Sequence, residues 1–148
     1  MIPFLIALAA PAPTQTPADI FAGLAGSCFR QPMPQNATDT HCFTVATGGK
    51  LAIDVHAVRD AAGKIVYQGV TVYTPSSDGK VALAYSNSLG DVMPGNVTRS
   101  GDKLSFMVII KDVPVLLSWT VRADGYDVDQ GSASQRFVRV GPAGEAGF

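Results

Sequence analysis

The chain of 148 residues contains two cysteines and two histidines, all within residues 28–56. His41 directly precedes Cys42, and in a catalytic site such residues can pair as a base with a thiol nucleophile. Residues 40–45 (THCFTV) are typical of a strand, where neighbouring side chains point to opposite faces, so we expect no such pair. The histidines and cysteines also lack the paired spacing of zinc sites, so we expect no metal ligands.

A second combination of reactive residues is Asp54 with His56, two positions apart. A carboxylate beside an imidazole can orient the ring as a general base. Both residues alternate with an apolar set: Leu51, Ile53, Val55 and Ala57. The polar face of an antiparallel sheet usually meets water, so we expect Asp54 and His56 at the surface unless the facing is inverted. We therefore assign no catalytic residue and keep an enzyme that uses His56 with Asp54 as an alternative function.

The two cysteines flank a segment that cannot form a central strand, because Pro32 and Pro34 lack backbone N–H donors. In an oxidising compartment two cysteines usually form one disulfide. Such a bond would close a loop of about 15 residues and stabilise the fold by about 3 kcal/mol. We predict that a Cys28–Cys42 disulfide clips a loop between two adjacent antiparallel strands.

The N-terminal residues indicate export. Residues 2–10 are apolar but shorter than the roughly 20 residues that span a bilayer, and residues 7–9 (ALA) fit the small-residue rule for signal peptidase. We predict a signal peptide over residues 1–9, a Pro-rich spacer over residues 10–16, and a periplasmic or secreted protein whose mature chain has no transmembrane segment. The formal net charge of -1 gives no electrostatic basis for binding nucleic acid. Nothing in the sequence sets the oligomeric state.

The elements that position these residues begin with one helix. Thr16 suits an N-cap, Pro17 the first turn, and Asp19 the positive end of the helix dipole. The apolar side of this segment is formed by Ile20, Phe21 and Leu24. We expect a single short helix that ends by Gly26 and packs across an opening of the fold.

Strands dominate the rest of the chain. Turn-forming segments recur about every 8–12 residues and separate about eight to ten apolar or alternating segments. This spacing is typical of an up-and-down antiparallel barrel or a sandwich, and strands do not alternate with helices as in a parallel sheet. We predict one all-β domain over residues 17–141, followed by a Gly-rich tail over residues 142–148.

Several short motifs carry a family likeness: residues 58–60 (VRD), 63–69 (GKIVYQG), 85–87 (YSN) and 136–140 (RFVRV). With these motifs, most of residues 17–140 resembles small bacterial lipocalin-like (calycin) domains of unknown function. The resemblance implies a closed barrel, with an arginine of the last motif across its closed end. In those domains a Gly-x-Trp motif opens the first strand. Here Cys28 stands at the Trp position, and a bond to Cys42 would replace the lost packing.

Three strand segments place aromatic or aliphatic side chains at alternating positions that can face one interior. We expect these side chains to bind a small, largely apolar molecule with one polar end, and no cofactor. Gly69 leaves space among them. The ligand-binding candidates are Tyr67, Gly69, Tyr73, Leu83, Tyr85, Leu117 and Trp119. Ordinary core packing is the alternative, which would make the chain an envelope structural or interaction protein with a filled barrel.

Overall fold

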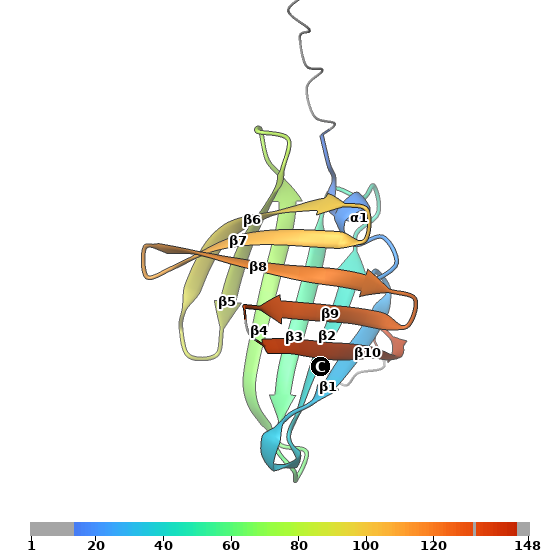
Figure 1. Cartoon of the computed structure of the whole chain (residues 1–148), viewed down its shortest axis with the longest axis vertical. Helices are drawn as coiled ribbons and strands as arrows, with labels where there is room; N and C mark the ends of the chain where they lie inside the picture. Colours follow the sequence, from blue (N-terminus) through green and yellow to red (C-terminus); the bar gives the residue numbers. More distant parts are fainter. Residues whose placement is uncertain (1–13, 132, 145–148) are drawn as a thin grey trace, which may run out of the picture.

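The computed structural model describes residues 14–131 and 133–144 (Figure 1). The predicted signal peptide and the first part of the spacer lie outside these residues. The described chain contains one short α-helix, α1 (Pro17–Ile20), one 3₁₀ turn, η1 (Pro34–Asn36), and ten strands. The strands are β1 (Ser27–Pro32), β2 (Thr38–Val45), β3 (Ala52–Arg59), β4 (Ile65–Pro75), β5 (Val81–Asn87), β6 (Val92–Ser100), β7 (Lys103–Ile110), β8 (Val113–Arg122), β9 (Gly125–Gln130) and β10 (Ala133–Pro142). Within the described ranges, no helix has the length and apolar character needed to cross a membrane.

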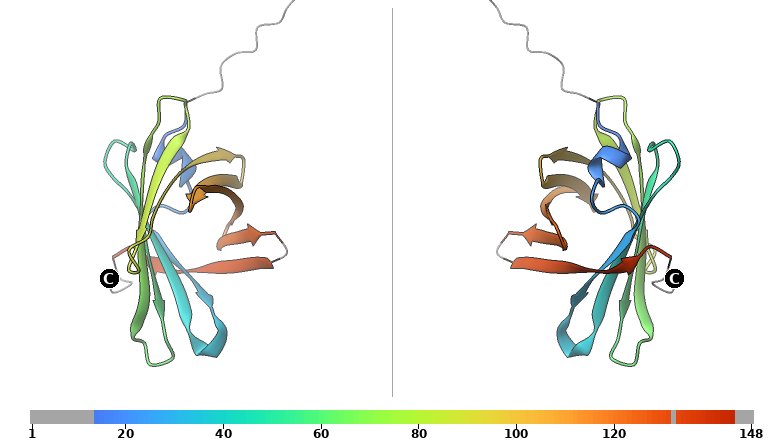
Figure 2. Two further views of the ribbon diagram at one scale, coloured as in Figure 1. Left: turned by 90° about the vertical axis from the view of Figure 1, so that its left-hand side faces the viewer. Right: turned by 90° about the vertical axis from the view of Figure 1, so that its right-hand side faces the viewer.

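The strands form a closed antiparallel barrel. Each strand pairs with the next along the chain, and β1 pairs with β10 to complete the ring. In Figure 1 strands β6–β10 run across strands β2–β5, and the side views of Figure 2 show these two groups of strands as two sides of one barrel. The predicted all-β up-and-down barrel with one short N-terminal helix is therefore confirmed, and the sandwich alternative is excluded.

The helix covers one end of the barrel. Thr16 and Asp19 form a reciprocal capping box, in which the Asp19 carboxylate accepts a hydrogen bond of 2.8 Å from the Thr16 N–H. The helix ends at Ile20, earlier than predicted, since the following turns place Gly23 in the left-handed region at φ 85°. Three apolar side chains of this segment are fully buried: Ile20, Phe21 and Leu24. They seal this end of the interior against water.

Two arginines fasten the segment after the helix to the barrel. Arg139 donates a hydrogen bond of 2.7 Å to the Gly23 carbonyl, and its guanidinium lies 4.8 Å from the ring centroid of Phe29. This arginine belongs to the RFVRV motif, and its contacts join β10 to the segment after the helix. The side chain of Arg99, on β6, donates a hydrogen bond to the Ile20 carbonyl. The Arg99 carbonyl accepts a hydrogen bond of 2.7 Å from Gln15 Nε2, and the Arg99 N–H donates one of 2.9 Å to Gln15 Oε1. The described end of the predicted spacer is thus anchored to the barrel.

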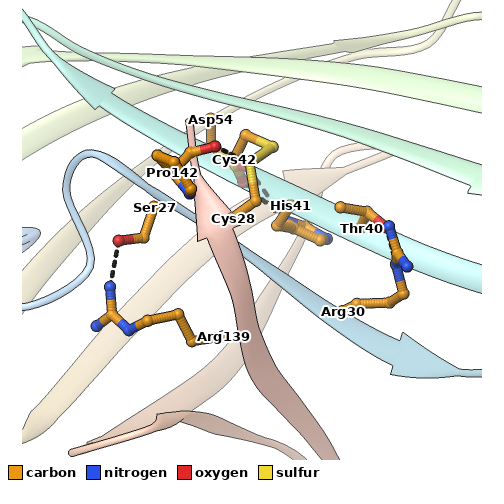
Figure 3. The surroundings of a disulfide bond; sticks show 9 residues. All are labelled: Ser27, Cys28, Arg30, Thr40, His41, Cys42, Asp54, Arg139 and Pro142. Carbon is orange, nitrogen blue, oxygen red and sulfur yellow. Dashed lines mark hydrogen bonds and ion pairs between the residues drawn. A yellow bond between two sulfur atoms is a disulfide. The ribbon is translucent and has the colours of Figure 1, made fainter. Parts of the chain in front are cut away.

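The disulfide lies beside the seam where the barrel closes. Cys28 on β1 stands directly opposite Cys42 on β2, and the two residues form the predicted bond (Figure 3). Both are buried, and Cys28 also stands opposite Gly141 of β10. The bond therefore ties the first strand to its neighbour at the level where that strand meets the last one.

Removing both cysteines tests this role. The Cys28→Ala/Cys42→Ala variant should unfold with a free energy lower by about 2–4 kcal/mol, because the unfolded chain is no longer constrained. Urea unfolding followed by far-ultraviolet circular dichroism measures the loss, and the folded spectrum should stay dominated by strands. The reduced wild-type protein provides the control and should match the variant. An unfolding midpoint equal to that of the oxidised wild type would show that the bond does not stabilise the barrel.

Candidate functional site

The barrel contains a cavity of about 300 Å³, lined by inward-facing residues of every strand from β2 to β10. Much of the lining is aromatic or aliphatic, with Leu83, Phe106, Leu117, Trp119 and Phe137 among its members. The aspartates and histidines of the lining all lie on β2 and β3, while Thr71, Gln130 and Gln135 add polar groups on other strands. The interior thus has an apolar wall and a polar wall.

The structure brings most of the predicted binding residues to this cavity. Five of them line it: Tyr73, Leu83, Tyr85, Leu117 and Trp119. Tyr67 bonds to the hydroxyl of Tyr85, and Gly69 lies directly under the His56 and Tyr85 side chains. Tyr67 and Gly69 are not among the lining residues, and ligand binding by the whole set stays a prediction.

The apolar wall is a stack of aromatic rings from consecutive strands. The ring centroids of Phe106 and Trp119 are 4.5 Å apart, those of Trp119 and Tyr126 are 4.7 Å apart, and those of Tyr126 and Phe137 are 4.8 Å apart. Neighbouring strands are separated by about 4.8 Å, which suits ring stacking. The series continues to His41 on β2, 5.0 Å from Phe137, so the two walls meet there.

The polar wall corrects one expectation. Asp54 and His56 line the cavity, and Asp54 is only 4% exposed, so the prediction that both lie at the surface is wrong. They also do not pair as expected. The Asp54 carboxylate lies 2.9 Å from Nδ1 of His41, whereas Nδ1 of His56 faces Oδ1 of Asp39 at 3.4 Å. The inward-facing carboxylates of Asp54 and Asp39 both lie beside the His41 imidazole, so their charges are compensated inside the barrel.

The strand register explains this arrangement. Both histidines belong to an Asp-x-His tripeptide, at residues 39–41 on β2 and 54–56 on β3, and His41 stands directly opposite His56. Residues two apart on a strand share a face, so all four side chains point inward together. The repeated tripeptide on consecutive predicted strands was the sequence signal for the missed residues, Asp39 and His41.

The polar contacts continue along the wall. His56 Nε2 lies 3.1 Å from the hydroxyl of Tyr85, and that hydroxyl bonds to the hydroxyl of Tyr67. The result is one connected series of polar side chains that crosses from β3 to β2 and back to β3, β5 and β4. In order, its members are Asp54, His41, Asp39, His56, Tyr85 and Tyr67.

The charges of this wall follow from its contacts. Burial disfavours a charged imidazole, but the nearby carboxylates of Asp54 and Asp39 raise the pKa of His41 to about 10. Burial also opposes ionisation of Asp39, yet the nearby imidazoles of His41 and His56 hold the pKa of its carboxyl well below the usual range. Burial raises the pKa of Tyr85, and the hydrogen bond with the Tyr67 hydroxyl raises it further. At neutral pH Asp39 and His41 are thus an ion pair, and Tyr85 is a neutral phenol.

Some polar atoms of the cavity are left without a partner. Among the residues that the structure describes, four buried side-chain atoms make no hydrogen bond: Asp39 Oδ1, His56 Nδ1, Trp119 Nε1 and Tyr126 Oη. All four residues line the cavity. A buried polar atom without a partner costs about 1–3 kcal/mol. A bound molecule or ion that contacts these atoms would therefore remove this free-energy cost.

The comparisons with known proteins do not name a family. No family model matches the sequence, and no curated protein matches it either. The ten-strand antiparallel barrel is compatible with a calycin-like fold. The function must therefore be inferred from the cavity and its two walls.

The ion pair of Asp54 with His41 should stabilise the fold. Asp54→Asn keeps the shape but removes the buried charge, and should lower the free energy of unfolding by about 2 kcal/mol or more. Urea unfolding measures the effect. Asp78→Asn is the matched control, because Asp78 pairs with Lys80 at the exposed surface and its loss should leave the midpoint unchanged. Equal effects of the two substitutions would contradict a stabilising role for the buried pair.

Gly69 allows His56 and Tyr85 to meet, since a Cβ at this position would overlap His56 Nε2 and lie 2.6 Å from the Tyr85 hydroxyl oxygen. Gly69→Ala should therefore break the hydrogen bond between the two side chains. Nitrogen-detected NMR of the imidazoles should show the His56 signals shifted and the His41 signals nearly unchanged. Gly141→Ala is the control, because a Cβ there meets nothing within 4 Å. Unshifted His56 signals in Gly69→Ala would show that the close approach does not matter.

Proposed function

We propose that this chain is an exported lipocalin-like protein that binds one small, largely apolar molecule with a polar end. The observation that carries the proposal is the cavity of about 300 Å³ with an aromatic wall that adjoins a polar one. Small-molecule sites have this composition, and their volumes begin at about 300 Å³. The sequence motifs and the closed barrel support the lipocalin-like assignment, and the Cys28–Cys42 bond supports an oxidising compartment.

The walls suggest the shape of the ligand. The stacked rings of Trp119, Tyr126 and Phe137 offer a flat surface to an aromatic or isoprenoid body. The unpartnered Trp119 N–H and the Tyr126 hydroxyl can donate hydrogen bonds to an acceptor on that body. A cavity at the low end of the usual size range favours a compact ring compound over a long fatty acid.

An enzyme on the same barrel is the second candidate. It is favoured by one observation, the position of the His56 imidazole between the Asp39 carboxylate at 3.4 Å and the Tyr85 hydroxyl at 3.1 Å, on the cavity wall. The carboxylate that faces His56 is thus Asp39 rather than Asp54. Recovery of a bound compound unchanged after long incubation favours the binding protein, and its conversion favours the enzyme. The filled-barrel alternative is disfavoured by the cavity.

Fluorescence of Trp119, the single tryptophan, tests ligand binding. Titration with aromatic metabolites, short isoprenoid alcohols and fatty acids, with a chelator present, should give saturable quenching or a blue shift for at least one class. A ligand that enters the cavity removes water from the indole and so changes its emission. If no class gives a saturable change, the binding proposal is wrong.

Two neighbouring leucines locate the site. Leu117 lines the cavity, whereas Leu116 is 78% exposed on the same strand. Leu117→Phe fills part of the cavity and should weaken binding by about tenfold or more, while Leu116→Phe should leave the affinity unchanged. Equal affinities for both variants would place the ligand outside the barrel.

A further inference from the structure

We propose that Asp39, His41 and His56 bind one divalent transition-metal ion, with zinc and ferrous iron as the fitting class, on the polar wall of the cavity. The metal site goes beyond the proposed ligand binding and does not depend on it. It rests on three observations: the spacing of the ligand atoms, their missing partners, and the contacts that orient the imidazoles.

The ligand atoms are already spaced for a metal. His56 Nδ1 lies 3.4 Å from Asp39 Oδ1, and His41 Nε2 lies 3.6 Å from Asp39 Oδ2. One ligand atom from each of the three residues lies within 4.8 Å of the others. Ligands about 2.1 Å from a tetrahedral metal are about 3.4 Å from one another. The metal displaces the proton of His41 Nε2 to solvent, as metals do at imidazole ligands, and small side-chain shifts then bring all three atoms to bonding distance.

Two of the three ligands are buried polar groups that lack a partner. Asp39 is only 9% exposed, and both its Oδ1 and His56 Nδ1 are buried without a hydrogen bond. The two atoms face each other across 3.4 Å. A cation between them would remove the cost of both unsatisfied groups at once.

The imidazoles are held from their far sides. His41 Nδ1 bonds to the Asp54 carboxylate at 2.9 Å, and His56 Nε2 bonds to the Tyr85 hydroxyl at 3.1 Å. Histidines that bind metals almost always use the second ring nitrogen in this way, which fixes the orientation of the ring. The nitrogens that remain are His41 Nε2 and His56 Nδ1, the ones that face Asp39.

The donor set indicates the class of metal. Imidazole nitrogens suit zinc and iron, whereas calcium and magnesium take oxygen ligands. Two histidines and one carboxylate leave coordination positions open, as in catalytic zinc and non-haem iron sites. Asp39, His41 and His56 all line the cavity, so a molecule in the cavity would reach the metal.

Calorimetric titration with zinc alone tests the site. The protein is tag-free, disulfide-intact, stripped with a chelator and dialysed. Saturable binding of one ion per chain is expected. Asp39→Asn and His56→Gln should weaken binding by about 100-fold or more, and Asp54→Asn by about 10–100-fold, as second-sphere changes do. Asp78→Asn, a surface carboxylate, should bind as the wild type does. Circular dichroism of each variant checks that it is folded.

A measurement on the wild type keeps the test independent of any variant. Cobalt(II) in place of zinc should give visible absorption bands of a low-symmetry nitrogen and oxygen site, and one equivalent of zinc should shift the NMR signals of both imidazoles together. Absent or non-saturable binding, or affinity equal in all variants, overturns the proposal and leaves a metal-free ion network. Because these titrations contain no organic ligand and the Trp119 titration contains a chelator, either proposal can fail while the other stands.

Discussion

The interior of this barrel depends on the pairing of the His41 imidazolium with the carboxylates of Asp54 and Asp39. A charge buried in a barrel is tolerated only beside an opposite charge with hydrogen bonds. That requirement fixes the register of β2 against β3, because a slip by one residue would turn Asp39 and His41 outward. The neighbouring strand β4 must then leave room for the side chains that point inward from β2 and β3. Gly69 on β4 leaves this room, since it has no side chain to overlap His56.

The two walls of the cavity have complementary roles. In the aromatic stack on β7–β10, each ring packs against a ring of a neighbouring strand, and Trp119 and Tyr126 lie between two rings. The polar wall on β2 and β3 carries the charges and two of the four unpartnered atoms, and the aromatic wall carries the other two, on Trp119 and Tyr126. A molecule between the walls would meet apolar contact on one side and directional contacts on the other. This asymmetry gives the cavity the means to orient what it binds.

Much of the fold was predictable because its signals are local. Turn spacing and the N-cap residue Thr16 depend on a few neighbouring residues, and each predicted its element correctly. The prolines between the cysteines did not set the strand bounds, since β1 extends to Pro32, which stands opposite Thr38 of β2. The inward orientation of Asp54 and His56 on β3 was not predictable. In the sequence these two residues look like surface residues unless their partners on β2 are known. The partnership of His41 with Asp54 depends on register between strands, which no single segment encodes. The grouping of Asp39, His41 and His56 also depends on this register, so the spacing of the histidines along the chain did not indicate it.

The position of the disulfide has a consequence for the order in which the barrel forms. β2 and β3 are consecutive strands, so the polar wall arises from contacts between residues close in the chain, whose closure costs little entropy. The pairing of β1 with β10 joins Cys28 to Gly141 and is the most distant strand pairing of the ring. Because the bond to Cys42 fastens β1 to β2, we expect the edge that receives the last strand to be held together before the barrel closes. Slow, non-local pairing is thus concentrated at a single seam.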